Sequence, residues 1–158
     1  MLTKQKKTSD HKSQSAARLY ALQALFQMEA SGLSVTNIKK EFETYRIGYD
    51  YDNNKIYQNE ADLGLFTKII YKAVEEQKKI DQLTNSILKN TWKLERIDPT
   101  LRALFRAATA EILLSQTPHK VVINEFVEIS KAFFSNNKET KLVNAILDKI
   151  TQSIDSTN

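Results

Sequence analysis

The sequence has no cysteine, only three glycines and only two prolines among its 158 residues. The absence of cysteine excludes a disulfide framework, a thiolate zinc site and a cysteine nucleophile. Glycine and proline support the tight turns of β proteins, so their scarcity favours helices joined by short links. The two histidines, His11 and His119, are too few and too far apart in the sequence for a convincing metal site. We therefore expect no cofactor and no metal.

Long hydrophobic runs are absent as well. No apolar segment approaches the roughly 20 residues that a membrane-spanning helix needs. The N-terminus contains lysines but lacks an apolar stretch of signal-peptide length. We expect a soluble, cytoplasmic protein.

The positive charge is unevenly distributed. The net charge is +4, and residues 1–18 contain five of the 23 basic side chains but only one of the 19 acidic ones. The remaining 140 residues therefore sum to zero, and all of the excess lies in an N-terminal arm that includes Lys12 and ends near Arg18. Charge alone fits two interpretations, a solubilising tail or an arm that binds phosphates.

Apolar residues recur at helical spacing and predict an all-α fold. The clearest segment runs from Asp98 to Ser115, where Asp98 can cap the helix and Pro99 suits its first turn. Thr117-Pro118 should stop this helix, since the residue before a proline is driven out of the helical region. Similar spacing predicts helices over 14–31, 34–45, 59–79, 80–91, 120–134 and 141–154. Residues 1–13 show no periodicity and are predicted to form a flexible basic arm, and 46–59 a polar excursion.

Some side chains invite both a functional and a structural interpretation. Arg102 and Arg106 share a helix face, where they could hold an anion or pair with carboxylates of the protein, for instance Glu111 or Glu128. Trp92, the only tryptophan, could stack on a base but more often serves as a core or hinge residue. The helix over 120–134 has two apolar stripes, so it either packs on two sides or offers one side to a partner.

Longer stretches form a recognisable pattern through their order and spacing, namely residues 17–27, 92–97, 101–108, 111–113, 121–133 and 142–150. Together these stretches resemble the NusB family of transcription antitermination factors. The resemblance implies about seven helices in two three-helix subdomains, about 14–91 and 92–154, which together form a single RNA-binding domain over 14–154. It implies no catalysis. Proteins of this family bind the boxA element of nascent RNA together with NusE, a small-subunit ribosomal protein, within the RNA polymerase antitermination complex on ribosomal RNA operons.

The resemblance also implies where the RNA binds. Aromatic residues would stack on bases and cations would hold phosphates. The resemblance implies these roles for Arg18, Phe26, Lys89, Phe133, Lys138 and Lys141, and the basic arm adds Lys12. We place Arg18 at the water-facing mouth of the first helix. From their place on the central helix, Leu101 and Arg102 are hypothesised to contact NusE. The oligomeric state, monomer or homodimer, is left open.

Two departures from the family pattern affect the predicted RNA surface. The arm carries lysines where the family often has clustered arginines, so its grip should be more sensitive to salt. Leu142 replaces a position that is often aromatic.

The sequence also fits two other interpretations in part. Some ribosomal-RNA cytosine methyltransferases carry a similar domain, but such an enzyme needs a cysteine nucleophile and a further α/β domain, so we expect no enzyme. The other interpretation is a helical protein–protein adaptor with little sequence-specific RNA binding.

Overall fold

The computed structural model describes the backbone of residues 2–49, 60–88 and 93–157, and side chains within these ranges from residue 10 onward. The described residues form seven α-helices and one π-helical turn, with no β-strand, which confirms the predicted all-α fold. The elements are α1 (Leu2–Ser31), α2 (Val35–Glu41), η1 (Phe42–Arg46), α3 (Leu63–Glu75), α4 (Gln77–Ile87), α5 (Pro99–Leu114), α6 (His119–Phe133) and α7 (Asn137–Thr157). None of these helices is both long and apolar enough to cross a bilayer.

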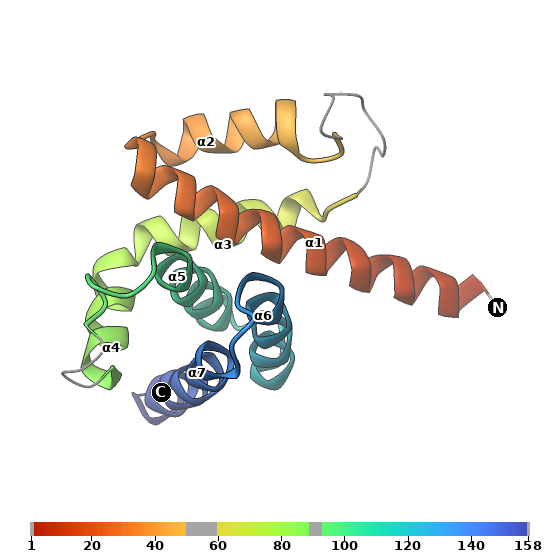
Figure 1. Cartoon of the computed structure of the whole chain (residues 1–158). Helices are drawn as coiled ribbons and strands as arrows, with labels where there is room; N and C mark the ends of the chain where they lie inside the picture. Colours follow the sequence, from red (N-terminus) through yellow and green to blue (C-terminus); the bar gives the residue numbers. More distant parts are fainter. Residues whose placement is uncertain (1, 50–59, 89–92, 158) are drawn as a thin grey trace.

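Helix α5 is the centre of the molecule. The Asp98 carboxylate accepts a hydrogen bond from the Thr100 amide at 2.7 Å, and Pro99 occupies the first turn, as the sequence predicts. Ten of the sixteen residues of α5 are buried, and the helix contacts α1, α3, α4, α6 and α7 (Figure 1). The helix ends at Leu114 because Ser115 adopts a left-handed conformation. This end lies before Thr117-Pro118, which the sequence analysis expected to stop the helix.

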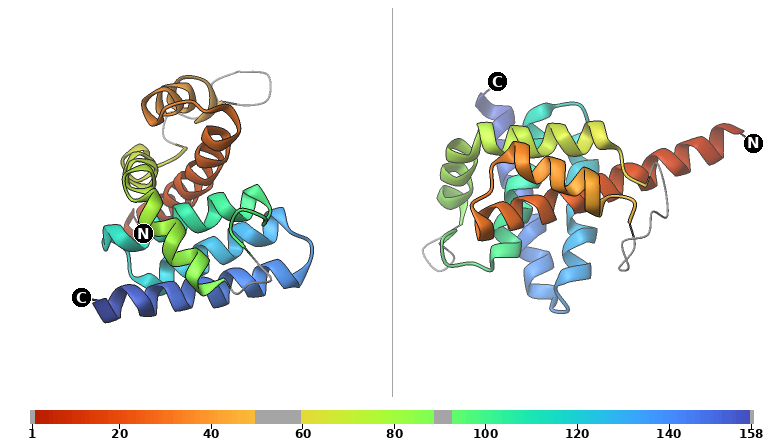
Figure 2. Two further views of the ribbon diagram at one scale, coloured as in Figure 1. Left: turned by 90° about the vertical axis from the view of Figure 1, so that its left-hand side faces the viewer. Right: turned by 90° about the horizontal axis from the view of Figure 1, so that it is seen from above.

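Helix α1 begins much earlier than predicted. The sequence analysis placed its start at Gln14, whereas α1 runs from Leu2, so the prediction that residues 2–13 form no helix is wrong. The flexibility expected of this arm stays a prediction. This segment has no proline or glycine and contains four lysines, which favour helices. Figures 1 and 2 show this end of α1 projecting from the body of the protein. A helix without a core to face needs no apolar stripe, and so periodicity could not reveal it.

The helices form two layers that meet along α5. Helices α1, α2 and α3 lie on one side and α5, α6 and α7 on the other (Figure 2), while α4 follows α3 and packs against α5 and α7. Buried alanines at 17, 21 and 24 have no exposed surface and let α1 approach its neighbours closely. The predicted boundary near residue 91, and Trp92 with it, lies outside the described residues.

Capping side chains set two other helix ends. Asp62 accepts a hydrogen bond from the Leu65 amide at 3.0 Å and starts α3 at Leu63; the predicted start at Asn59 lies outside the described residues. Ser34 caps α2 by accepting from the Asn37 amide, which decides between the two caps that the sequence allows, Ser34 and Thr36. At the other end of α1, Gly32 has a φ of 75° and terminates the helix after Ser31.

Candidate nucleic-acid interface

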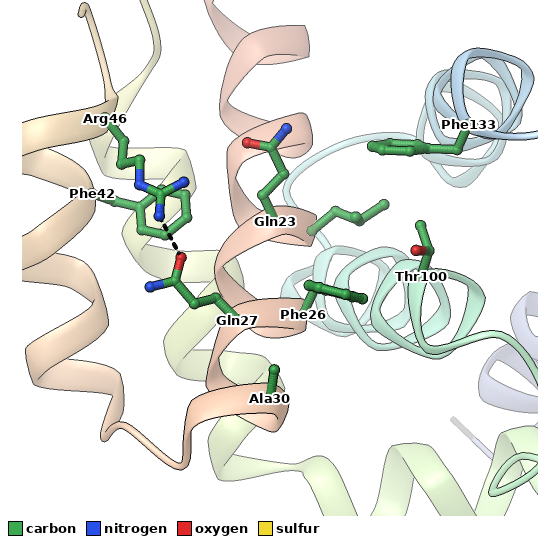
Figure 3. A pocket seen from close by; sticks show the side chains of 9 residues that line it. Gln23, Phe26, Gln27, Ala30, Phe42, Arg46, Thr100 and Phe133 are labelled. Carbon is green, nitrogen blue, oxygen red and sulfur yellow. Dashed lines mark hydrogen bonds between the residues drawn. The ribbon is translucent and has the colours of Figure 1, made fainter. Parts of the chain in front are cut away.

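Two exposed phenylalanines line one hollow on the surface. Phe26 is 41% exposed and Phe133 is 42% exposed, and both border a hollow of about 450 Å³ (Figure 3). Phe26 belongs to α1 and Phe133 is the last residue of α6. The two residues are 107 positions apart in the sequence, and the fold brings them to the same hollow. Other aromatic side chains are as exposed, for example Tyr45 at 66% and Tyr71 at 39%, so the feature that distinguishes Phe26 and Phe133 is that they line the same hollow.

The local structure explains why these rings face outward. Phe26 follows Ala24 and Leu25 on α1, and these two side chains are buried whereas that of Phe26 is not. Helix α6 ends at Phe133 because Phe134 adopts an extended conformation, which turns Phe134 toward the core and leaves Phe133 at the rim. Both rings therefore owe their exposure to their backbone positions.

Polar groups lie among the mainly apolar residues that line the hollow. Gln23, Phe26, Gln27 and Ala30 follow the i, i+3, i+4, i+7 spacing of a single helix face and form the floor. Thr100 of α5 stands beside Phe26, and Arg46 of η1 lines the side across α1 from Phe133 (Figure 3). The hollow thus combines aromatic rings, amide groups and a cation, the three kinds of group that single-stranded RNA-binding surfaces use.

Arg18 is not on this surface, and its predicted exposure to water is wrong. Its side chain is 1% exposed and forms two parallel hydrogen bonds with Glu111, from Nε to Oε1 at 2.7 Å and from Nη2 to Oε2 at 2.9 Å. Nη1 lies 3.7 Å from Glu125 Oε1. A cation buried at this depth is held by carboxylates because an unpaired one would be strongly destabilising. In this conformation Arg18 cannot reach a phosphate.

Arg102 and Arg106 pair with carboxylates of the protein, though with different ones from those suggested. Arg102 forms a bidentate pair with Glu29, and Arg106 binds Asp81 through two hydrogen bonds at 2.8 and 2.9 Å and Glu29 at 2.7 Å. The hydrogen bonds and charge of Arg102, aided by Arg106, lower the pKa of Glu29 despite some opposing desolvation. This network joins α1, α4 and α5.

The hypothesised NusE contact through Leu101 and Arg102 stays a prediction, and the low exposure of both residues does not favour it. Leu101 is 2% exposed and belongs to the core, and the Arg102 side chain is 12% exposed. Arg102 Nη1 donates to the backbone carbonyl of Leu94 at 2.9 Å in addition to its pair with Glu29. Helix α5 is packed by other helices on most of its sides and so exposes few residues to a partner. Helical spacing in the sequence shows one apolar face but does not show how many faces are covered.

The predicted lysines are placed apart from the aromatic rings. Lys12 is exposed on α1, 14 residues before Phe26 and therefore about 21 Å away along the helix axis. Lys138 and Lys141 are exposed in the first turns of α7, and neither lines the hollow. Lys89 lies outside the described residues.

Helix α6 uses its two apolar stripes differently. Val122, Phe126 and Ser130 are buried, whereas Val121 is 40% exposed and Ile129 partly buried. These two residues line a second hollow of about 680 Å³ between α1 and α6, together with Leu19. Within the described ranges, no three histidine, aspartate or glutamate side chains lie together in a way that could hold a metal.

The sequence analysis missed Arg46 and Thr100 as members of the surface. Gln23 and Gln27 could have been found, because they share a helix face with Phe26. Arg46 stands at the edge of a polar stretch that carries no periodic signal, and only the packing of η1 beside α1 places it there.

The helix order and the central position of α5 define the class, a small all-helical domain built from two layers of helices. The sequence profile of the NusB family matches residues 15–152, and the chain belongs to this family of transcription antitermination factors. The transcription antitermination protein NusB of Sinorhizobium fredii is 45% identical over 140 residues, which cover 88% of this chain and 86% of that protein.

Solved structures agree with this assignment. The Thermotoga maritima (T. maritima) NusB structure is 27% identical, with a TM-score of 0.68 over 87% of this chain and 89% of that one. A structure of the antitermination factors NusB and NusE in complex with double-stranded RNA contains a chain that is 21% identical, with a TM-score of 0.69 over 88% of this chain and 96% of that one. At this identity the second comparison shows the shared fold.

Proposed function

We propose that this protein binds boxA RNA together with NusE and promotes antitermination in ribosomal RNA operons. The observation that carries the proposal is the pair of exposed rings, Phe26 and Phe133, on one hollow with amide and guanidinium groups beside them. Family membership supports an antitermination role, and a related fold has been solved with NusE and RNA. In this role the protein joins the RNA polymerase antitermination complex as a binding component without catalysis.

The physical basis of RNA binding is stacking combined with phosphate contacts. An unpaired base can lie flat on an exposed aromatic ring, and each such stack contributes about 1–3 kcal/mol. Phe26 and Phe133 offer two ring faces, and the carboxamide of Gln23 stands on the same helix face for contacts with base edges. The exposed lysines Lys12 and Lys141 supply more distant positive charge.

The test measures fluorescence anisotropy of a labelled boxA RNA and of a scrambled RNA, with and without NusE, at two salt concentrations. Phe26→Ala and Phe133→Ala should each weaken boxA binding about tenfold, since each removes one stacking surface. Tyr71→Ala is the matched control, because Tyr71 is 39% exposed on α3 and does not line the hollow.

The outcomes separate this function from an adaptor. Tighter binding of boxA than of the scrambled RNA, strengthened by NusE and lost in both phenylalanine variants, supports antitermination through this surface. Equally weak binding of both RNAs, abolished by salt and unchanged in the variants, would contradict it. The protein would then act as a helical adaptor, for which the hollow between α1 and α6 is the exposed apolar region.

A further inference from the structure

We propose that Arg46 is an RNA-contacting residue, which holds a phosphate of the strand whose bases lie on Phe26 and Phe133. The inference rests on the proposed function and extends it across α1 to the η1 turn. Arg46 is not among the RNA-binding residues predicted from the sequence. The proposal gives the bound strand a path across the hollow, from the side of Phe133 to the side of Arg46.

The first step is the shape of the hollow. Arg46 and Phe133 line the same hollow from opposite sides of α1, and Phe26, Gln23 and Gln27 lie between them (Figure 3). Of the described residues that line it, Arg46 alone has a charged side chain. A strand with bases on the aromatic side therefore meets a cation within the same depression when it continues over α1.

The second step is that the guanidinium is already oriented. It lies over the Phe42 ring, 5.2 Å from the ring centroid, and Nη2 donates to Gln27 Oε1 at 2.9 Å. Phe42 has no exposed surface and stacks on Phe66, with 5.9 Å between centroids, so the platform beneath Arg46 is anchored in the core. An ordered guanidinium loses less conformational entropy on binding than a mobile one.

The third step is the number of free donors. The contacts with Gln27 and, at 3.5 Å, with Glu41 both use Nη2. Among the described residues, Nε and Nη1 have no acceptor, and the side chain is 49% exposed. Nε and Nη1 point to different sides of the guanidinium, so each can donate one N–H to a phosphate oxygen of a strand that crosses it.

Glu41 makes the contact directional rather than purely electrostatic. Its carboxylate accepts two hydrogen bonds from the Gln27 amide, both at 3.1 Å, and partly offsets the charge of Arg46. A carboxylate at this place repels a phosphate that approaches from its side. It therefore favours approach to the Nε side of Arg46, and removing its charge should strengthen RNA binding.

The experiment measures the affinity of the full-length protein for boxA RNA, without NusE, over a range of salt concentrations. Arg46→Met keeps aliphatic cover over Phe42 and removes the charge, whereas Arg46→Lys keeps the charge and removes the planar fork. Lys78→Met, at an exposed position on α4, removes the same charge away from the hollow. Circular dichroism melting checks that each variant is folded.

Arg46→Met should weaken binding about fivefold and lower the slope of log K against log salt by about 0.7, the value for one phosphate on a single strand. Arg46→Lys should retain the slope with reduced affinity, Glu41→Gln should bind more tightly, and Lys78→Met should behave as the unaltered protein. Unchanged affinity and slope in Arg46→Met, with Phe26→Ala still impaired, would overturn the role of Arg46 and leave the proposed function intact. Unchanged binding in both variants would overturn both.

Discussion

At the scale of single residues, Arg18 shows how burial changes the role of a charge. Its position at the end of a basic arm suggested a phosphate contact, yet its guanidinium is enclosed and bound to Glu111. Helix α1 packs against α5 and α6 at this point, and the pair joins α1 to α5 at the centre of the fold. We therefore assign Arg18 to stability rather than to RNA recognition.

Replacing Arg18 alone should destabilise the protein strongly. Arg18→Met leaves the Glu111 carboxylate buried without its partner, and we expect the free energy of unfolding to fall by about 3–5 kcal/mol in urea denaturation. The double variant Arg18→Met, Glu111→Leu should recover most of this loss, because no uncompensated charge remains. A single variant as stable as the unaltered protein would contradict the assigned role.

RNA binding gives an independent check on Arg18. Under conditions where the double variant is folded, its affinity for boxA RNA and its salt slope should equal those of the unaltered protein. A slope lowered by about 0.7 in the double variant would instead return Arg18 to the phosphate-binding residues.

At the scale of secondary-structure elements, Glu29 connects three helices. It stands three residues after Phe26 on α1 and receives hydrogen bonds from Arg102 and Arg106 on α5, while Arg106 also binds Asp81 on α4. The network therefore fixes the end of α1 that carries Phe26 relative to the helix that carries Thr100. It stabilises the wall of the hollow without lining it.

The network should make stability depend on pH in a defined direction. The pKa of Glu29 is lower in the folded protein than its ordinary value of 4.5, mainly because Arg102 donates hydrogen bonds to the carboxylate. Its contribution is therefore fully present above about pH 4.5 and is lost as the pH falls through the folded-state pKa. Glu29→Gln should lower Tm at pH 7 by about 3 °C, or about 1 kcal/mol for a partly exposed pair.

Thermal melting at several pH values checks this expectation. The difference in Tm between the unaltered protein and Glu29→Gln should shrink as the pH falls below about 4.5 and through the lowered pKa of Glu29 in the folded protein, because the carboxylate is then protonated in both the folded and unfolded chains. A difference that is constant over this range would show that charge at Glu29 does not contribute. Glu75→Gln, at an exposed position near the end of α3, serves as the control.

The ends of helices were easier to predict from the sequence than the ion-pair partners of individual side chains. The cap at Asp98, the cap at Ser34 and the end of α1 at Ser31 follow from local chemistry, which the sequence displays directly. The partners of Arg18 and Arg102 are 93 and 73 positions away, and no local pattern distinguishes one carboxylate from another. The pairing of Phe26 with Phe133 came from family resemblance, and Arg46 required the structure.

At the scale of the whole molecule, charge and shape are separated along α1. The aromatic hollow lies toward the C-terminal end of this helix, and the excess of positive charge lies toward its projecting N-terminal end. One helix thus connects a region suited to bases with a region suited to phosphates. The division predicts that specificity and general affinity can be altered independently.

Neutralising the projecting end should weaken RNA binding without regard to sequence. Replacement of Lys4, Lys6 and Lys7 by glutamine removes charges from a helix that stands clear of the body, so Tm should not change. If the three lysines neutralise three phosphates, the salt slope should fall by about 2, and boxA and scrambled RNA should lose affinity by the same factor. Anisotropy titrations at several salt concentrations measure both quantities.

The control for the arm removes equal charge elsewhere by substituting glutamine at three exposed positions, Lys78, Lys79 and Lys149. A lower slope only in the arm variant locates the phosphate contacts on the projecting end of α1, because both variants have the same net charge. Equal slopes in the arm variant and the unaltered protein would make the arm a solubilising tail. A larger loss for boxA than for scrambled RNA would mean that the arm reads sequence, which point charges on lysine side chains are poorly suited to do.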